Sequence, residues 1–216
     1  MTQPAVSLKP EMQYADLAQQ GETAQLGMWL FLATEVLFFG GMMAAYLAYR
    51  LTYPADFAKA AKESVLWIGS VNTVILLTSS VTMVMAIESA AAGAQRRILR
   101  YLLVTAGLGV LFLILKGYEY AKDYEDAVFP VLNFHIERAH AGPAELFWLF
   151  YFYATGLHAI HLTIGIVLVL VMAHRARRGA FRLGYYAPLE VTGLYWSFVD
   201  TVWVFLFALI YPIGRS

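Results

Sequence analysis

Four ionisable side chains lie in the middle of long apolar stretches of this sequence: Glu35, His158, His161 and Asp200. An ionisable group at the centre of a bilayer costs about 2.5–3.5 kcal/mol on insertion scales, so such groups usually pair with one another or serve a function. Proton transfer and the fixing of helix packing are the two kinds of role that they support. These four residues are therefore the first candidates for a site.

Glu35 lies roughly 13 Å along a helix that starts at residue 27, at the rise of a standard α-helix. It could relay protons or face lipid or a partner protein. Alternatively, it is a protonated, hydrogen-bonded carboxyl group that fixes helix packing. The other apolar stretches offer no Lys or Arg at a matching depth. A pairing with His158 or His161 is possible, but one sequence does not place the helices relative to each other.

His158 and His161 are three residues apart, so they lie on one face of a helix. Two such imidazoles cannot bind opposite faces of one haem, and His135, His140 and His174 lie in loops or at the end of a stretch. We therefore expect no haem, copper or iron site within this chain, which argues against a b-type cytochrome. The sequence favours two imidazoles that hydrogen-bond to neighbouring helices.

Asp200 stands between Trp196 and Trp203 in the last apolar stretch. Its expected partner is a His, Tyr or backbone group on a neighbouring helix, or a partner subunit. Glu190 precedes that stretch, close to an arginine-rich connector, and a salt bridge to one of those arginines is expected.

Hydroxyl and amide side chains in the second stretch suit hydrogen bonds between helices, and they are Asn72, Thr73, Ser79 and Ser80. Small residues at a spacing of four let helix backbones approach closely. The first stretch contains two such series, which are Gly40, Ala44 and Ala48, and Gly41 and Ala45.

The composition of the 216 residues is 60% hydrophobic and 14% charged. Soluble domains average about 45–50% apolar and about 25% charged residues, so the sequence excludes a soluble enzyme, a disordered chain and a basic nucleic-acid binder. The formal net charge is zero, and the chain contains no cysteine. Disulfides and thiolate metal sites are therefore excluded as well. The chain is expected to be an integral membrane protein.

A membrane-spanning helix needs roughly 20 apolar residues. Five stretches of the sequence meet this length, and they predict an all-α bundle of five transmembrane helices: 27–49, 65–87, 98–118, 146–173 and 194–213. Residues 1–26 are expected to form a polar tail, and residues 27–216 a single transmembrane domain. Residues 55–63 could form a short surface helix. Arg100 and Lys116, near the ends of the third stretch, are expected to reach the membrane surface.

The orientation follows from the arginines of two short connectors. The positive-inside rule places these connectors and the N-terminus in the cytoplasm, and the C-terminus on the outer, periplasmic side. The connector after the third stretch is instead acidic and includes Glu119 and Asp123. The connector arginines are Arg96, Arg97, Arg175, Arg177, Arg178 and Arg182.

Three sequence segments resemble the haem-copper oxidase subunit III family, also described as cytochrome c oxidase subunit 3. WLFLATEVLFFGG (29–41) is similar to the family helix that carries an intramembrane glutamate, here Glu35. ATGLHAIHLTIG (154–165) resembles its two-histidine helix. LYWSFVDTVWVFLF (194–207) resembles its terminal helix. In addition, Glu190 matches an acid before that helix, and GYEY (117–120), with Glu119, matches a Glu-Tyr pair.

The resemblance implies an accessory subunit of a bacterial haem-copper oxidase in the cell membrane. In such enzymes subunit I holds the haems and copper, and subunit II of a cytochrome c oxidase holds further copper. Subunit III binds no redox cofactor, packs on subunit I, holds phospholipids and supports proton uptake and stability during turnover. By resemblance, Glu35 is the buried glutamate near lipid. The positions with a mainly structural role are His158, His161, Glu190, Trp196, Asp200 and Glu119.

Two features depart from the longest family members. Those members have seven spans, whereas five are expected here, so the lipid cleft would be shallower, absent or completed by another subunit. Ser197 also stands where the family usually has a histidine.

Three alternative functions remain open at this point. The chain could be subunit III of a quinol oxidase or an accessory protein of a nitric oxide reductase. It could also be a proton-coupled transporter in which Glu35, His158 and Asp200 form a relay.

Overall fold

The computed structural model describes residues 10–63, 66–126, 128–129, 133–134, 141–181 and 185–212. The helices in these ranges are α1 (Leu17–Thr52), α2 (Pro54–Glu63), α3 (Leu66–Ala91), α4 (Gln95–Glu125), α5 (Ala141–Arg177) and α6 (Ala187–Ile210). Two short antiparallel strands, β1 (Val128–Phe129) and β2 (Asn133–Phe134), lie between α4 and α5.

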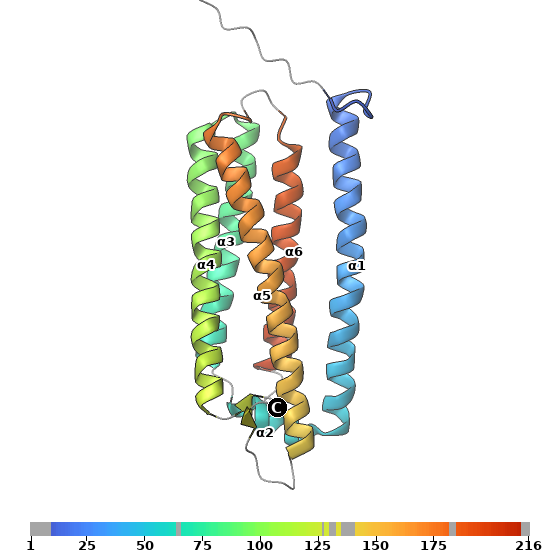
Figure 1. The fold of residues 1–216 in the computed structure, drawn as a ribbon, viewed down its shortest axis with the longest axis vertical. Helices are drawn as coiled ribbons and strands as arrows, with labels where there is room; N and C mark the ends of the chain where they lie inside the picture. Colours follow the sequence, from blue (N-terminus) through green and yellow to red (C-terminus); the bar gives the residue numbers. More distant parts are fainter. Residues whose placement is uncertain are drawn as a thin grey trace, which may run out of the picture.

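The long helices run alternately up and down (Figure 1). Helices α3, α4, α5 and α6 form a bundle, and α1 stands at its edge, mainly against α6. The start of α1 and the α3–α4 and α5–α6 connections share one end of the molecule. Helix α2, the strand pair and the end of α6 lie at the opposite end. Each long helix is therefore tied to its sequence neighbour by a connection at one end of the bundle.

Five of the described helices are long and apolar enough to cross a membrane, which confirms the predicted all-α five-helix bundle. The short helix expected over residues 55–63 is also present, as α2. The helices nevertheless extend beyond the predicted apolar stretches. Helix α1 begins at Leu17, so residues 17–26 of the predicted tail are helical. Likewise, α4 continues to Glu125 and includes residues that we had assigned to an acidic connector.

Local signals explain these helix boundaries. Asp16 caps α1, because its carboxylate accepts a hydrogen bond of 2.8 Å from the backbone N–H of Gln19. Gly93, in the turn between α3 and α4, has a φ of 68°, which a residue without Cβ adopts at little cost. Pro188 stands in the first turn of α6, where its missing N–H costs no helical hydrogen bond.

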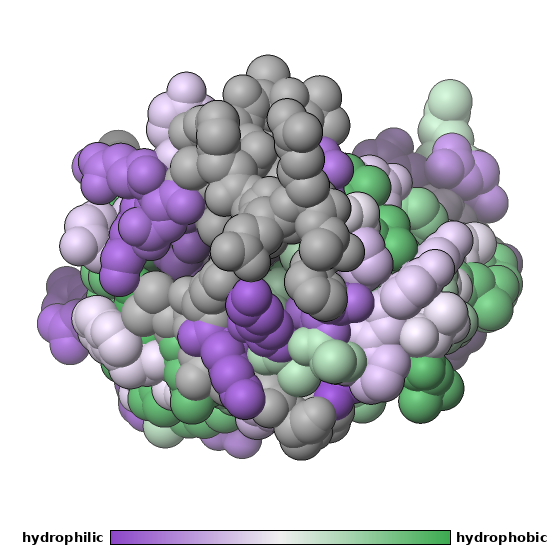
Figure 2. Space-filling model, turned by 90° about the horizontal axis from the view of Figure 1, so that it is seen from below, coloured by the Kyte–Doolittle hydropathy of each residue, from purple (hydrophilic) through white to green (hydrophobic). Residues whose placement is uncertain are grey.

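Aromatic rings fill much of the bundle interior. Trp148, Trp196, Trp203, Tyr151 and Tyr211 are among its largest fully buried side chains. Leucine, valine and isoleucine side chains cover the outer faces of the helices, as expected for surfaces that contact lipid. Viewed from the end that carries α2, hydrophilic side chains gather over the bundle and hydrophobic ones show at its rim (Figure 2).

Candidate functional site

Glu35 of α1 and His161 of α5 contact each other, a pairing that the sequence left open. His161 Nε2 lies 3.2 Å from Glu35 Oε2, and His161 Nδ1 lies 2.9 Å from the carbonyl oxygen of Leu157. A carbonyl oxygen only accepts hydrogen bonds, so Nδ1 carries a proton. The contact between Nε2 and Oε2 then requires one further proton, on either atom. The two side chains therefore form a site that shares a proton.

This pair is accessible but held in place. The side chain of Glu35 is 18% exposed and that of His161 is 16% exposed. The Tyr195 hydroxyl donates a hydrogen bond of 3.0 Å to the backbone carbonyl of His161. The Phe39 ring meets the imidazole edge to face, with 5.3 Å between ring centres. The pair can therefore meet a molecule that approaches from the bilayer.

A groove of about 230 Å³ lies between α1 and α6. Phe39 connects it to the Glu35–His161 pair, because this ring both lines the groove and contacts the imidazole. Thr201 is the groove's one hydroxyl-bearing residue, and it donates its proton to the Ser197 carbonyl. The lining is therefore suited to hydrocarbon: Val36, Phe39, Gly40, Met43, Phe198, Thr201, Val202 and Phe205.

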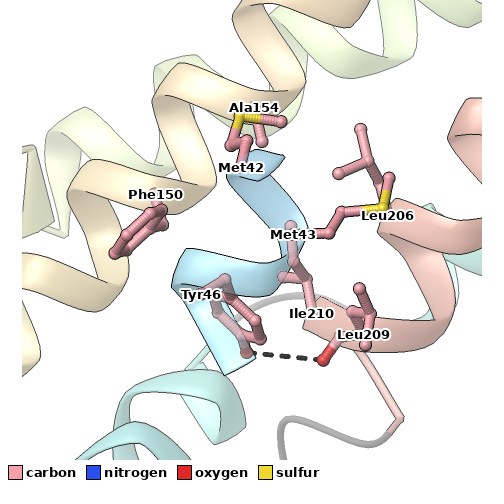
Figure 3. A pocket seen from close by; sticks show the side chains of 8 residues that line it. All are labelled: Met42, Met43, Tyr46, Phe150, Ala154, Leu206, Leu209 and Ile210. Carbon is pink, nitrogen blue, oxygen red and sulfur yellow. Dashed lines mark hydrogen bonds between the residues drawn. The ribbon is translucent and has the colours of Figure 1, made fainter. Parts of the chain in front are cut away.

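A second, much smaller space lies where α1 meets α5 and α6 near the α2 end (Figure 3). Its volume of about 10 Å³ is at the lower limit for one water molecule. The Tyr46 hydroxyl approaches the carbonyl oxygen of Leu209 at 3.4 Å (Figure 3). Met42, Met43 and Phe150 are among the side chains that line this small space. Helix α1 is thus tightly packed here and leaves a groove farther along its length.

His158 does not behave as expected from the sequence. Its side chain is buried between the rings of Phe112 and Trp203, at 5.5 and 5.1 Å between ring centres. Among the described residues, neither of its ring nitrogens has a hydrogen-bond partner. The expectation that both histidines bond to neighbouring helices is therefore wrong for His158, because aromatic side chains enclose it. Its three-residue spacing from His161 does not bring the two into one site.

Asp200 bonds within the chain to the hydroxyl of Ser80 on α3. We had expected a His, Tyr or backbone partner, or another subunit. Two tryptophans of α6 strengthen the same interface, since Trp196 Nε1 donates to Ser79 Oγ at 3.1 Å and Trp203 Nε1 donates to Thr73 Oγ1 at 3.0 Å. Three of the four polar side chains expected to link helices from α3 therefore do so.

Asn72 is the exception, because neither of its side-chain polar atoms has a partner among the described residues.

Glu190 lies in the first turn of α6 rather than before the helix. Its described hydrogen bond comes from the Gln25 amide of α1, with a distance of 3.1 Å between Nε2 and Oε2. The predicted arginine partner is thus replaced by a glutamine, because α1 extends far enough to reach the start of α6. Arg182 lies outside the described residues.

A buried cluster at the opposite end of the bundle contains Glu119 together with Lys116, Asp123, Tyr151 and Tyr211. Lys116 Nζ donates to Glu119 Oε2 at 3.0 Å and to the Tyr151 and Tyr211 hydroxyls, both at 2.9 Å. Burial raises the pKa of the Tyr211 hydroxyl, so it remains a donor to Glu119 Oε1 at 2.6 Å. The prediction that Lys116 reaches the membrane surface is wrong, since its ammonium group is held inside by these oxygens.

We did not predict this cluster from the sequence, although the sequence contains one signal of it. Lys116 and Glu119 are three residues apart and therefore neighbours on a helix face. We ended the third apolar stretch at residue 118 and so separated the two. Tyr151 and Tyr211 come from other helices and gave no comparable signal.

The two glycines of the small-residue series in α1 do not pack closely against another described helix. A Cβ atom added at Gly40 or Gly41 would meet nothing within 4 Å. The close packing expected from their spacing is therefore absent among the described residues. Gly40 instead keeps the groove open.

Within the ranges that the structure describes, no three His, Cys, Asp or Glu side chains are placed to hold a metal ion. The loop residues His135 and His140 lie outside those ranges. The expected absence of a redox centre from this chain stays a prediction.

The fold and the site define a membrane-embedded helical bundle with a carboxylate–imidazole pair beside an apolar groove. The family described as cytochrome c oxidase subunit III has a model that matches residues 12–215. This match covers nearly the whole chain. The chain belongs to the cytochrome c oxidase subunit III family.

Individual relatives include proteins named for two kinds of oxidase. Cytochrome c oxidase subunit 3 of Synechocystis sp. is 32% identical over 186 residues, which cover 86% of this chain and 73% of the relative. Its counterpart in Thermostichus vulcanus is 30% identical over 191 residues, or 88% of this chain and 87% of that protein. A probable quinol oxidase subunit 3 of Staphylococcus aureus is 31% identical over 199 residues, covering 90% and 91%.

Proposed function

We propose that this chain is the accessory subunit III of a bacterial cytochrome c oxidase. It packs on subunit I, which carries haem and copper, and assembles with subunit II, which carries further copper. It binds phospholipid, supports proton uptake and stabilises the enzyme during turnover in aerobic respiration. The observation that carries this proposal is the Glu35–His161 pair, which is largely buried but still accessible beside the groove between α1 and α6.

The pair supports a role near proton uptake because its two side chains share a proton and remain partly accessible. A neutral or internally compensated pair is also the form in which a carboxylate is tolerated at membrane depth. It places an exchangeable proton near the surface of the bundle. We do not assign it a catalytic role, since the oxygen chemistry belongs to subunit I.

The groove supports the lipid-binding role. Its walls offer apolar side chains, and an acyl chain that is already in the hydrocarbon of the bilayer would be held there by van der Waals packing. A phospholipid acyl chain has the matching chemistry and would fill the space between α1 and α6. It would also link α1, which contacts mainly α6, more firmly to the bundle.

Substitution at Gly40 tests the lipid proposal. Gly40 lines the groove and has open space where a side chain would start, so Gly40→Leu directs an apolar side chain into the groove. We expect this variant to fold normally and to retain less phospholipid after purification in mild detergent, as measured by mass spectrometry. Gly41→Leu is the matched control, because Gly41 is equally open but does not line the groove. Equal lipid retention in both variants and the wild type would contradict the proposal.

A quinol oxidase is the second candidate, favoured by the Staphylococcus aureus relative. The relatives named for the two enzymes are about equally similar to this chain. Other subunits bind the electron donor, so an assay of the purified complex with reduced cytochrome c and with quinol distinguishes the two.

The location that we propose is the bacterial inner membrane, with the N-terminus in the cytoplasm. The start of α1 shares one end of the molecule with the two connections that follow α3 and α5. Those connections are flanked by Arg96, Arg97, Arg175, Arg177 and Arg178. Arginines in short loops favour the cytoplasmic side. The C-terminus would then lie on the periplasmic side.

A further inference from the structure

The cluster around Lys116 has fewer hydroxyl protons than its contacts require. Three oxygen–oxygen contacts lie at hydrogen-bond distance: Tyr211 to Glu119 Oε1 at 2.6 Å, Tyr151 to Glu119 Oε1 at 2.9 Å, and Tyr151 to Asp123 Oδ2 at 3.1 Å. Each tyrosine hydroxyl carries one proton, so the two tyrosines supply two protons for three contacts. The ammonium protons of Lys116 cannot supply the third proton, because all three are donated in other contacts.

Those ammonium contacts are complete. Lys116 Nζ donates its three protons to Glu119 Oε2, the Tyr151 hydroxyl and the Tyr211 hydroxyl. Tyr151 therefore accepts from Lys116 and donates to only one carboxylate. With ionised carboxylates, either its contact with Glu119 or its contact with Asp123 would bring two oxygen lone pairs together.

The charge of the cluster also indicates that one proton is missing. Among the described residues, Lys116 contributes one positive charge and the two carboxylates contribute two negative charges, so the ionised cluster has a net charge of −1. The exposed fractions are 2% for Lys116, 0% for Glu119 and 3% for Asp123. An uncompensated charge buried to this extent is strongly disfavoured. One added proton supplies the missing hydrogen bond and neutralises the excess negative charge.

We propose that this cluster is a buried proton-binding site in which Asp123 Oδ2 holds the proton and donates it to the Tyr151 hydroxyl oxygen. Tyr151 then donates to Glu119, and each of the three oxygen–oxygen contacts contains one proton. Glu119 remains ionised because it contacts the ammonium group directly at 3.0 Å. Asp123 instead contacts the neutral Tyr151 hydroxyl, at 3.1 Å.

The other ionisable groups near Asp123 fit this assignment. On its own helix these are Lys116, Glu119 and Tyr120, and Asp126 follows directly after the helix. Tyr120 bonds away from the cluster to Thr155 at 2.6 Å. Helix α5 supplies Tyr151, and the residue after α6 is Tyr211. Asp126 is exposed and adds negative charge, which favours a proton on Asp123. The bound proton thus links the end of α4 to α5.

This site is distinct from the Glu35–His161 pair and does not depend on the proposed oxidase role. The test is infrared spectroscopy of the full-length chain that carries isotopically labelled aspartate, at neutral pH in mild detergent. A protonated aspartate gives a carbonyl stretching band that shifts with the label, whereas an ionised one does not. We expect such a band in the wild type and its loss in Asp123→Asn.

Asn at position 123 is a matched replacement, because its amide donates to Tyr151 and carries no charge. Asp200→Asn is the control for the other buried aspartate and should leave the Asp123 band in place. Tyr151→Phe gives an independent measurement on the labelled chain, since loss of the acceptor should shift the band. The proposal fails if the wild type shows no labelled acid band, or if the whole band survives in Asp123→Asn. An acid band from labelled glutamate that disappears in Glu119→Gln would also overturn it.

Discussion

Lys116 shows how a bilayer protein accommodates a full positive charge in its interior. Three oxygen atoms accept its protons, and its ammonium group lies 4.4 Å from the centre of the Tyr151 ring, within the range of a cation–π contact. Only Glu119, among these acceptors, brings a compensating charge into direct contact. The stability of the region should therefore depend strongly on that one carboxylate.

Glu119→Gln is expected to destabilise the chain by about 3–5 kcal/mol, because Lys116 loses the carboxylate that contacts its buried ammonium group directly. Thermal unfolding in detergent measures the loss. Glu125→Gln, on the exposed part of the same helix, is the control and should unfold like the wild type. If the two variants unfold alike, Lys116 does not depend on Glu119 in this way.

Glu35→Gln is expected to leave assembly and the initial rate of oxygen consumption largely unchanged, since in the proposed function the oxygen-reducing site lies in subunit I. A glutamine can still hydrogen-bond to His161 but cannot exchange its proton. The proposed role predicts faster loss of activity during sustained turnover, followed as oxygen consumption over time. A purified complex that lacks haem would count against this account.

At the scale of elements, Trp196 of α6 packs between glycines on two neighbouring helices. A Cβ atom at Gly109 of α4 would lie 2.9 Å from this ring, and one at Gly165 of α5 would lie 3.2 Å from it. The indole is fully buried and bonded to Ser79, so it has little freedom to move away. The absence of side chains at these glycines therefore sets the distance between α4, α5 and α6.

Gly109→Ala should lower the free energy of unfolding by about 1–3 kcal/mol, the usual cost of overpacking a core. Gly107→Ala is the matched control on the same helix, because a Cβ atom there meets nothing within 4 Å. Thermal unfolding of the two variants provides the comparison. A stable Gly109→Ala variant would show that the indole can shift.

The five long helices could be predicted because hydropathy alone reports long apolar helices, whereas the short strand pair was not predicted. Their ends were harder to predict, since residues 17–26 of α1 are polar and carry no hydropathy signal. The partners of Asp200 and Glu190 were also missed. Such partners depend on which helices are neighbours and on how they are rotated, and a single sequence does not contain this information.

From the sequence, a pairing of Glu35 with one of the two histidines could be predicted as a possibility. Which histidine it is could not be predicted, because a single sequence does not show how the helices are rotated. Both side chains needed a partner in the bilayer, and either histidine would have satisfied Glu35. The two histidines differ in their surroundings, because aromatic rings enclose His158 while His161 faces α1. Lys116 was misplaced because a position near the end of an apolar stretch is equally compatible with a surface side chain.

At the scale of the whole molecule, the chain is a bundle with an edge helix, a groove and a largely apolar outer surface. Such a molecule suits attachment to a larger membrane partner. Membership of the cytochrome c oxidase subunit III family indicates an oxidase as that partner. The central claim of this account is therefore association with a subunit that contains haem and copper.

The most direct test is to tag this chain in its own host, purify it in mild detergent, and record the visible spectrum with haem and copper analysis. We predict that haem and copper purify in stoichiometric amounts with a larger partner subunit. A colourless chain that is isolated alone after gentle extraction would contradict the proposed role.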